Sequence, residues 1–175
     1  VLLCYVASEQ RLRVLNFSGR APRAAQPAGY TPEAQMLGLR APLVPGNVAG
    51  WLTLLDTYGS MPRQHVLAPA IAYAEQGVPL TTVNGDFIAH NRHILAQFPT
   101  SAQIFLPGGT VPQPGTVLRQ TDLAQSLRMI AAAGQEVFYR GDLAERLSQI
   151  VAQHDGLLTR QDLAVKVFKD LVGKP

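Results

Sequence analysis

Two apolar segments, residues 2–7 and 12–17, open the chain and are separated by a polar turn at residues 8–11. Short apolar runs on both sides of a polar turn are typical of a hairpin of two strands. A hairpin this apolar needs more sheet or a helical layer to cover it, and the chain shows no further convincing strand. We therefore expect the rest of its sheet to come from elsewhere.

Prolines and glycines interrupt the next segment, residues 18–45, at Pro22, Pro27, Pro32, Pro42, Pro45, Gly19, Gly29 and Gly38. This composition predicts a connection with little regular structure. Connections this long are uncommon inside a compact domain and are often functional.

The remaining chain has the apolar spacing of helices. The first predicted helix begins at Asn47 and ends at Gly59, and the next two run over residues 63–76 and 82–98. A fourth runs from Thr121 to Gly134, a fifth ends at Gly156, and the last begins at Thr159. Their predicted inward side chains are Val48, Trp51, Leu52 and Leu55; Val66, Leu67, Ala70, Ile71 and Ala74; Val83, Phe87, Ile88 and Leu95; Leu123, Leu127, Ile130 and Ala131; and Leu143, Leu147, Ile150 and Val151.

Two details complete the predicted elements. Serine, proline and glycine in residues 99–115 predict an exposed loop around the apolar run 104–106. Asp162 stands three residues after Thr159, a position that suits the N-terminus of the last helix.

The composition narrows the class of protein. The 175 residues, 47% hydrophobic and 15% charged, predict one globular domain or most of one. The net charge is +3, but the arginines are scattered without aromatic neighbours, so no nucleic-acid partner is expected. We also expect no membrane association, since no apolar run is long enough to cross a bilayer and no basic stretch precedes the first apolar block.

All the lysines lie near the end of the chain, at positions 166, 169 and 174. We therefore predict a domain over residues 1–164 and a tail over 165–175 that does not belong to it. A chance cluster of lysines in a short native helix is the alternative.

Candidate chemistry is sparse. Asp86, His90 and His93 would share one face of a continuous helix, which gives a metal-binding hypothesis against the simpler interpretation of a solvated polar face. No serine or threonine has a nucleophile motif, and Cys4 has no partner cysteine. We expect no metal site, no cofactor and no catalytic residue in this chain.

Ser18, Gly19 and Arg20 form the best candidate for a ligand contact. They stand where an apolar strand gives way to the proline-rich connection, and an arginine there is able to grip a carboxylate with two parallel hydrogen bonds. The alternative is an ordinary surface arginine.

Several sequence motifs in order carry a stronger signal. Residues 44–80 contain VPGNVAG with two predicted helices, and residues 118–164 contain LRQTDLA, FYRG and GLLTRQDLA. Over roughly residues 2–164 the chain resembles the gamma-glutamyltranspeptidase family. That resemblance implies an α+β chain, mostly a helical lobe plus a β-hairpin, forming part of the αββα four-layer fold of N-terminal nucleophile hydrolases.

The same resemblance implies a function and a partner. In the family one precursor cleaves itself, and the new N-terminal threonine of the small subunit is the nucleophile. This chain would belong to the large subunit and end before the cleavage point, so it would be inactive alone. Its partners would be the small, nucleophile-bearing subunit and a small-molecule amide substrate.

One departure bears on specificity. In the family, the motif L-D-F-R-E-T-A-P contains the arginine that holds the substrate α-carboxylate. This motif aligns with LNFSGRAP at residues 15–22, and the position of its arginine is occupied here by Ser18. Arg20 lies two residues along, on the same side of an extended segment. The motif SGRAP at residues 18–22 resembles that of relatives that hydrolyse other amides.

A non-catalytic helical interaction module remains the alternative function. The localisation also remains open between the bacterial periplasm and the cytoplasm.

Overall fold

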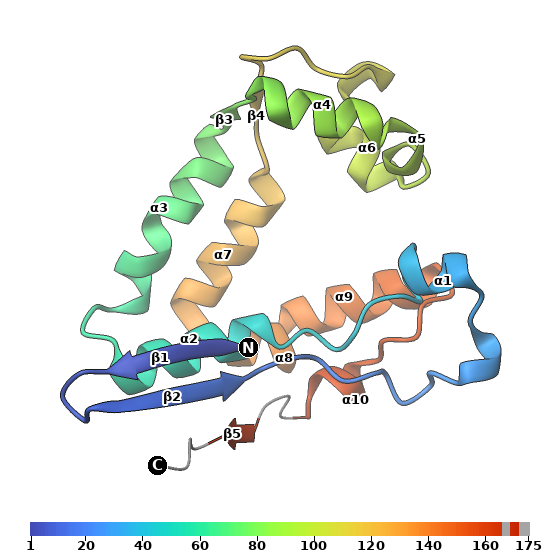
Figure 1. Ribbon diagram of the computed structural model, residues 1–175. Coiled ribbons are helices and arrows are strands. Elements are labelled where there is room, and N and C mark those ends of the chain that lie inside the picture. The colour runs from blue at the N-terminus through green and yellow to red at the C-terminus, as the bar shows by residue number, and fades with distance from the viewer. Residues whose placement is uncertain (166–168, 172–175) are drawn as a thin grey trace. The chain divides into compact units, whose positions relative to one another are not determined.

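The predicted hairpin is the first element of the computed structural model, which describes residues 1–165 and 169–171 (Figure 1). Strand β1 (Leu2–Val6) pairs antiparallel with β2 (Arg11–Asn16), with Leu2 opposite Leu15 and Val6 opposite Arg11. The hairpin is confirmed. Its turn places Gln10 at a φ of 52°, in the left-handed region.

The expectation of no further strand is wrong. A third strand, β5 (Lys169–Leu171), pairs antiparallel with β2, and a second small sheet joins β3 (Val78–Pro79) to β4 (Val117–Leu118). Strands of two or three residues have too few positions to show an alternating pattern. The boundary at residue 164 remains a prediction, because most of the tail, including Lys166 and Lys174, lies outside the described residues.

The chain divides into two compact units. The first contains Val1–Arg63 and the chain from Ala132 onward, and the second contains Gln64–Ala131. Each is described by itself.

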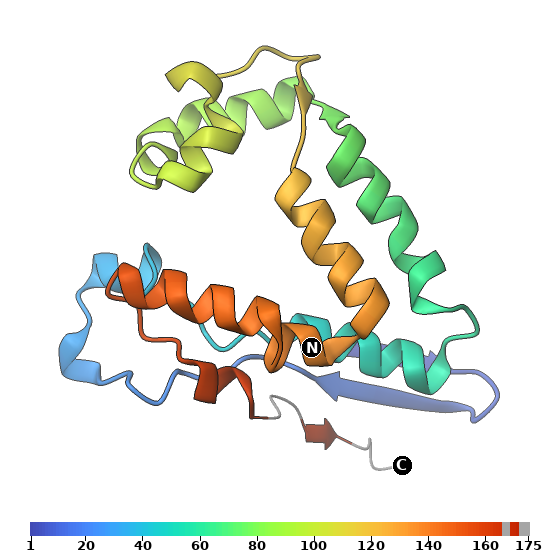
Figure 2. The same cartoon turned by 180° about the vertical axis from the view of Figure 1, so that it is seen from behind.

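The first unit holds the three-stranded sheet and several helices. These are η1 (Pro27–Gly29), α1 (Pro32–Met36), α2 (Asn47–Tyr58), α8 (Gln135–Tyr139), α9 (Asp142–Gln153) and α10 (Arg160–Leu163). The proline-rich connection is irregular as predicted, apart from η1 and α1. Figure 2 shows α9 and α10 from the other side.

Helix α2 covers one face of the hairpin. Its buried residues are Val48, Ala49, Gly50 and Leu52. A Cβ at Gly50 would lie 2.3 Å from the ring of Phe17, so the helix backbone rests directly on that ring. Two details differ from the prediction: Gly46, not Asn47, is the N-cap residue, and Trp51 is 52% exposed.

The core of this unit gathers segments that are distant in sequence. It consists of Val44, Ala144, Val151, Leu158 and Leu163, with Leu39 and Leu147 packed against it. On α9 the small Ala144 faces the core, while Ile150, predicted to point inward, is 49% exposed.

The second unit is helical. It comprises most of α3 (Arg63–Gln76), then α4 (Thr82–His90), α5 (Arg92–Leu95), α6 (Pro99–Phe105), η2 (Pro107–Gly109) and most of α7 (Thr121–Ala133). Its core consists of Leu80, Ile88 and Leu106.

Three predictions fail in this unit. The single helix expected over residues 82–98 breaks at Asn91, which caps α4. The loop expected over residues 99–115 contains α6, and Leu106 at its end is buried because the apolar run 104–106 faces the core. Several side chains predicted to point inward are exposed, namely Val66, Ala70, Val83, Phe87 and Leu123.

Among the described residues, no helix combines the length and the apolar character needed to cross a bilayer.

Candidate functional site

The segment that follows β2 packs closely against Leu43 and Val44, which precede α2. Ser18 is exposed, and its backbone N–H donates to Asn16 Oδ1 at 3.0 Å. A Cβ at Gly19 would lie 2.2 Å from the carbonyl oxygen of Val44, a distance that no larger residue tolerates without movement. Gly19 is therefore required for this contact.

Arg20 is anchored through its backbone. The Val44 N–H donates to the Arg20 carbonyl oxygen at 2.9 Å, and Val44 itself is fully buried. The core of the unit therefore fixes the position from which the Arg20 side chain extends.

The guanidinium of Arg20 has two donor atoms that are not engaged in hydrogen bonds among the described residues. Its Nε and Nη2 atoms are buried and have no hydrogen-bond partner among the described residues. A buried donor without an acceptor costs about 1–3 kcal/mol, more when the group is charged. The arrangement therefore favours binding of an acceptor, and a carboxylate matches the planar fork of an arginine best.

A buried carboxylate, Asp162, lies on α10 beside this segment. In both views of the chain α10 lies next to the segment that follows β2 (Figures 1 and 2). The Arg23 N–H donates to Asp162 Oδ1 at 3.1 Å. The N–H and hydroxyl of Thr159 donate to Asp162 Oδ2 at 3.0 and 2.7 Å.

These contacts keep Asp162 ionised. Burial is the largest single influence and by itself raises the pKa of the carboxyl group. The hydrogen bonds from Thr159 and the Arg23 N–H, with the positive charge of Arg20, outweigh it and hold the pKa below its ordinary value. The site thus contains a buried anion, Asp162, whose pKa is lowered in part by the positive charge of Arg20.

Sequence reasoning placed Asp162 at a helix start but missed its second role. The capping box with Thr159 is confirmed. The contact to Arg23 joins residues 139 positions apart, and no local pattern announces it. The sequence offered only the capping position of Asp162 as a signal, because its complete burial becomes visible only in the fold.

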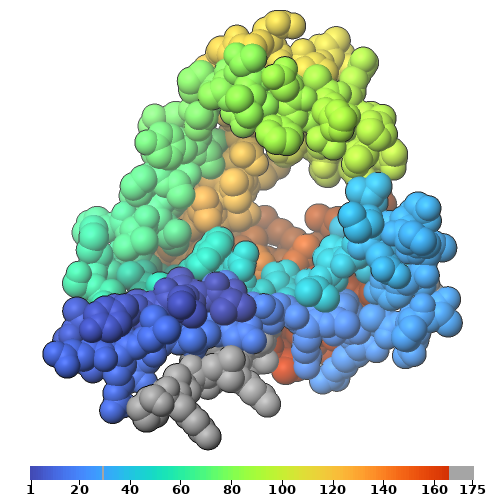
Figure 3. All heavy atoms as spheres, viewed as in Figure 1, coloured from blue at the N-terminus to red at the C-terminus, as the bar shows by residue number. Residues whose placement is uncertain are grey.

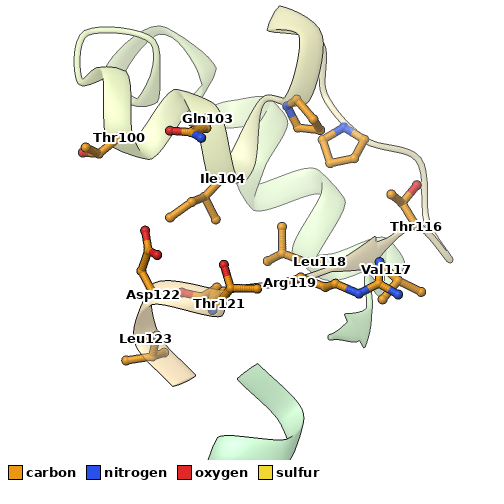
Figure 4. A pocket seen from close by; sticks show the side chains of 13 residues that line it. Thr100, Gln103, Ile104, Thr116, Val117, Leu118, Arg119, Thr121, Asp122 and Leu123 are labelled. Carbon is orange, nitrogen blue, oxygen red and sulfur yellow. The ribbon is translucent and has the colours of Figure 1, made fainter. Parts of the chain in front are cut away.

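A cavity of about 340 Å³ lies in the second unit (Figure 4). Ile104 from α6, Asp122 from α7 and Leu118 from β4 are among the residues that line it. Its lining includes threonines but no histidine or cysteine, so no base stands ready to activate a hydroxyl. None of Ser18, Gly19 and Arg20 belongs to it.

The residues of the metal hypothesis do not form a cluster. Asp86 and His90 lie on α4, His93 lies on α5 after the break, and all three are exposed. In the part of the chain that the structure describes, no three His, Cys, Asp or Glu side chains come together as metal ligands. The helix break explains this, since the proposed spacing assumed one continuous helix.

Comparison with known proteins identifies the family. The family model for gamma-glutamyltranspeptidase matches residues 1–170. The acylase ACY 1 proenzyme of Pseudomonas sp. (strain SE83) is 40% identical over 129 residues, which are 74% of this chain and 23% of that protein. The glutathione hydrolase proenzyme of Escherichia coli is 37% identical over 121 residues, 69% of this chain and 21% of that protein. The chain belongs to the gamma-glutamyltranspeptidase family.

A solved structure confirms the fold. Helicobacter pylori gamma-glutamyltranspeptidase superposes with a TM-score of 0.90 at 28% identity, covering 96% of this chain and 50% of that one. The chain therefore has the predicted α+β fold, a helical lobe and a hairpin from the αββα fold of N-terminal nucleophile hydrolases. It spans about a quarter or less of the length of the two curated relatives.

Proposed function

We propose that this chain is the large-subunit part of an amidohydrolase or transpeptidase whose nucleophile is the N-terminal threonine of a small subunit from the same precursor. Family membership supports this, and both curated relatives are proenzymes. An N-terminal threonine activates its hydroxyl with its own amine, so no histidine is needed from this chain. On this proposal the chain alone is inactive.

Within that enzyme, the segment of Ser18, Gly19 and Arg20 contacts the substrate, and Arg20 holds a carboxylate of the acyl donor. The observation that carries this assignment is the pair of buried guanidinium donors, Nε and Nη2, without a partner among the described residues. A carboxylate would accept both in a bidentate geometry. Gly19 lets the segment lie against Val44, and Ser18 is exposed beside it.

The substrate class follows from this chemistry. The acyl donor is an amide that carries a carboxylate at a fixed distance from the scissile bond, and the acyl group passes to water or to an amine. Of the two relatives compared above, the Pseudomonas protein is an acylase proenzyme and the Escherichia coli protein a glutathione hydrolase proenzyme. Because the arginine stands at position 20 and Ser18 takes the family's arginine position, we propose a carboxylate-bearing amide other than glutathione as the preferred substrate.

The test uses the processed two-subunit enzyme. Replacing Arg20 by Ala is expected to raise KM by roughly ten-fold or more with a smaller effect on kcat, because binding is lost in ground state and transition state alike. Arg20→Lys should fall between, since lysine keeps the charge but loses the fork. Steady-state kinetics with a γ-glutamyl anilide and with the matching acyl anilide that lacks the α-carboxylate measure both effects.

Arg23→Ala is the matched control. The Arg23 residue is exposed, and its contact with Asp162 uses the backbone N–H, which alanine retains. Its KM should equal that of the unmodified enzyme. If Arg20→Ala leaves KM unchanged, or raises it equally for the substrate without a carboxylate, Arg20 does not bind the carboxylate.

A further inference from the structure

A buried anion, Asp162, is hydrogen-bonded to the segment that carries the proposed substrate-binding arginine, and it accepts none of that arginine's Nε and Nη2 donors. Asp162 is fully buried, and two groups of Thr159 and the Arg23 N–H donate to it. A carboxylate offers about four lone-pair sites, so three of them are already occupied. The Nε and Nη2 donors of Arg20 have no partner among the described residues.

We propose that Asp162 is a positioning residue for Arg20: it attracts and orients the guanidinium through its charge, while Thr159 and Arg23 occupy the carboxylate and leave the guanidinium donors for the substrate. This inference rests on the proposed function of Arg20.

The energetics explain why such an anion is useful. Burying an unpaired guanidinium is unfavourable, and a nearby anion offsets much of that penalty. A direct bidentate ion pair would also offset it, but the pair would then compete with the substrate carboxylate for the same N–H groups. An anion held by other donors gives the electrostatic benefit without that competition.

The fold makes this arrangement rigid. Thr159 and Asp162 form a reciprocal capping box at the start of α10, and the neighbouring Leu163 is fully buried in the core. The Arg23 N–H ties the segment that carries Arg20 to the same carboxylate. Asp162 therefore fixes both the backbone near Arg20 and the field around its side chain.

Asp162→Asn separates charge from structure. The chain itself shows that asparagine supports this cap, since Thr81 and Asn84 form the same reciprocal box at the start of α4. In the processed enzyme we expect Asp162→Asn to raise KM for the carboxylate-bearing anilide by roughly three- to ten-fold, with kcat nearly unchanged. The KM for the anilide without a carboxylate should stay constant.

Asp162→Glu is the conservative variant, because it restores the charge and glutamate is a common residue at this cap position. Its KM for the carboxylate substrate should fall between those of the unmodified enzyme and Asp162→Asn. If Asp162→Asn does not fold, Asp162→Glu carries the test alone, and a KM raised equally for both anilides would overturn the proposal. Asp142→Asn, which removes an exposed carboxylate from the start of α9, is the control and should leave both KM values unchanged.

The outcomes separate the two proposals. If Arg20→Ala raises KM selectively but Asp162→Asn does not, Arg20 binds the carboxylate and Asp162 is only a helix cap. If Asp162→Asn lowers kcat and raises KM for both substrates together, its role is structural and the positioning proposal fails. If neither variant changes KM, the proposed function of Arg20 fails as well.

Discussion

At the scale of single residues, Tyr139 joins two segments of the first unit through one hydroxyl group. The hydroxyl donates to the Pro45 carbonyl oxygen at 3.0 Å and accepts from the Ala49 N–H at 3.1 Å. Burial raises the pKa of Tyr139, although the Ala49 N–H lowers it in part. The hydroxyl is therefore protonated near neutral pH and able to make both bonds.

Tyr139→Phe should lower the free energy of unfolding by about 1–3 kcal/mol, because it leaves the Ala49 N–H and the Pro45 carbonyl oxygen without their buried partner. Chemical denaturation followed by circular dichroism measures the change. Tyr73→Phe is the matched control, since Tyr73 is 66% exposed, and it should have almost no effect. Equal stability of the two variants would show that the hydroxyl of Tyr139 contributes nothing.

Sequence reasoning at this scale succeeded where the signal was local. The capping box of Thr159 and Asp162 follows from two residues three positions apart. The burial of Asp162 and its bond to Arg23 depend on segments that meet only in the folded chain. The assignment of Ser18, Gly19 and Arg20 to a substrate site stays a prediction.

At the scale of elements, long apolar patterns were sufficient and short ones were not. The hairpin and α3 match their predicted positions, and α3 continues through Pro69. Helix α6 was missed because its start at Pro99 follows a break and its composition is typical of loops. Trp51 was predicted to be buried because the helical pattern shows which side chains share an apolar face. The pattern does not show which edge of that face the rest of the chain covers, and Trp51 lies at an exposed edge.

The contact of α2 with β2 gives a prediction at this scale. Gly50→Ala should lower the free energy of unfolding by about 1–3 kcal/mol, because the new methyl group would overlap the ring of Phe17 in a packed core. The nearest ring atoms lie 2.3 Å from the Cβ position. Thermal or chemical denaturation of the variant measures the loss.

Gly85→Ala is the matched control, because it also changes a buried glycine inside a helix, α4. The nearest atom to its Cβ position is 4.0 Å away, so the methyl group fits. Alanine should therefore be neutral or stabilise by up to about 1 kcal/mol, as expected from helix propensity. A loss of stability as large as that of Gly50→Ala would show that the cost of a methyl group does not come from the contact with Phe17.

At the scale of the whole molecule, composition predicted one globular domain or most of one, and within it the chain forms two compact units. The boundaries fall at Arg63/Gln64 and Ala131/Ala132, inside helices α3 and α7. The first boundary lies one residue after the run Gly59-Ser60-Met61-Pro62, whose composition is typical of a linker, whereas the second lies inside α7, whose apolar pattern is continuous across it. Composition therefore marks one of the two boundaries and leaves the other unmarked.

The hairpin presents an apolar face that nothing covers among the described residues. Leu3, Tyr5 and Leu12 are 65%, 62% and 50% exposed, and the register places Tyr5 opposite Leu12. The opposite face carries Leu15 and packs toward Phe17 and α2. Figure 3 shows β1 at the surface of the first unit. In a four-layer αββα fold two sheets pack face to face, and an apolar face of this kind is suited to such a contact.

This face predicts that the chain alone associates with itself, because exposed apolar patches of this kind favour association. Replacing Leu3 and Tyr5 together by threonine keeps strand propensity but removes apolar area, so the double variant should sediment as a monomer at concentrations where the unmodified chain forms larger species. Sedimentation velocity over a range of concentrations measures this. Val83→Thr with Phe87→Thr removes comparable exposed apolar area from α4 and should leave association unchanged. A monomeric unmodified chain would contradict the prediction, whereas association lost only in the hairpin variant would identify this face as the surface through which the chain associates.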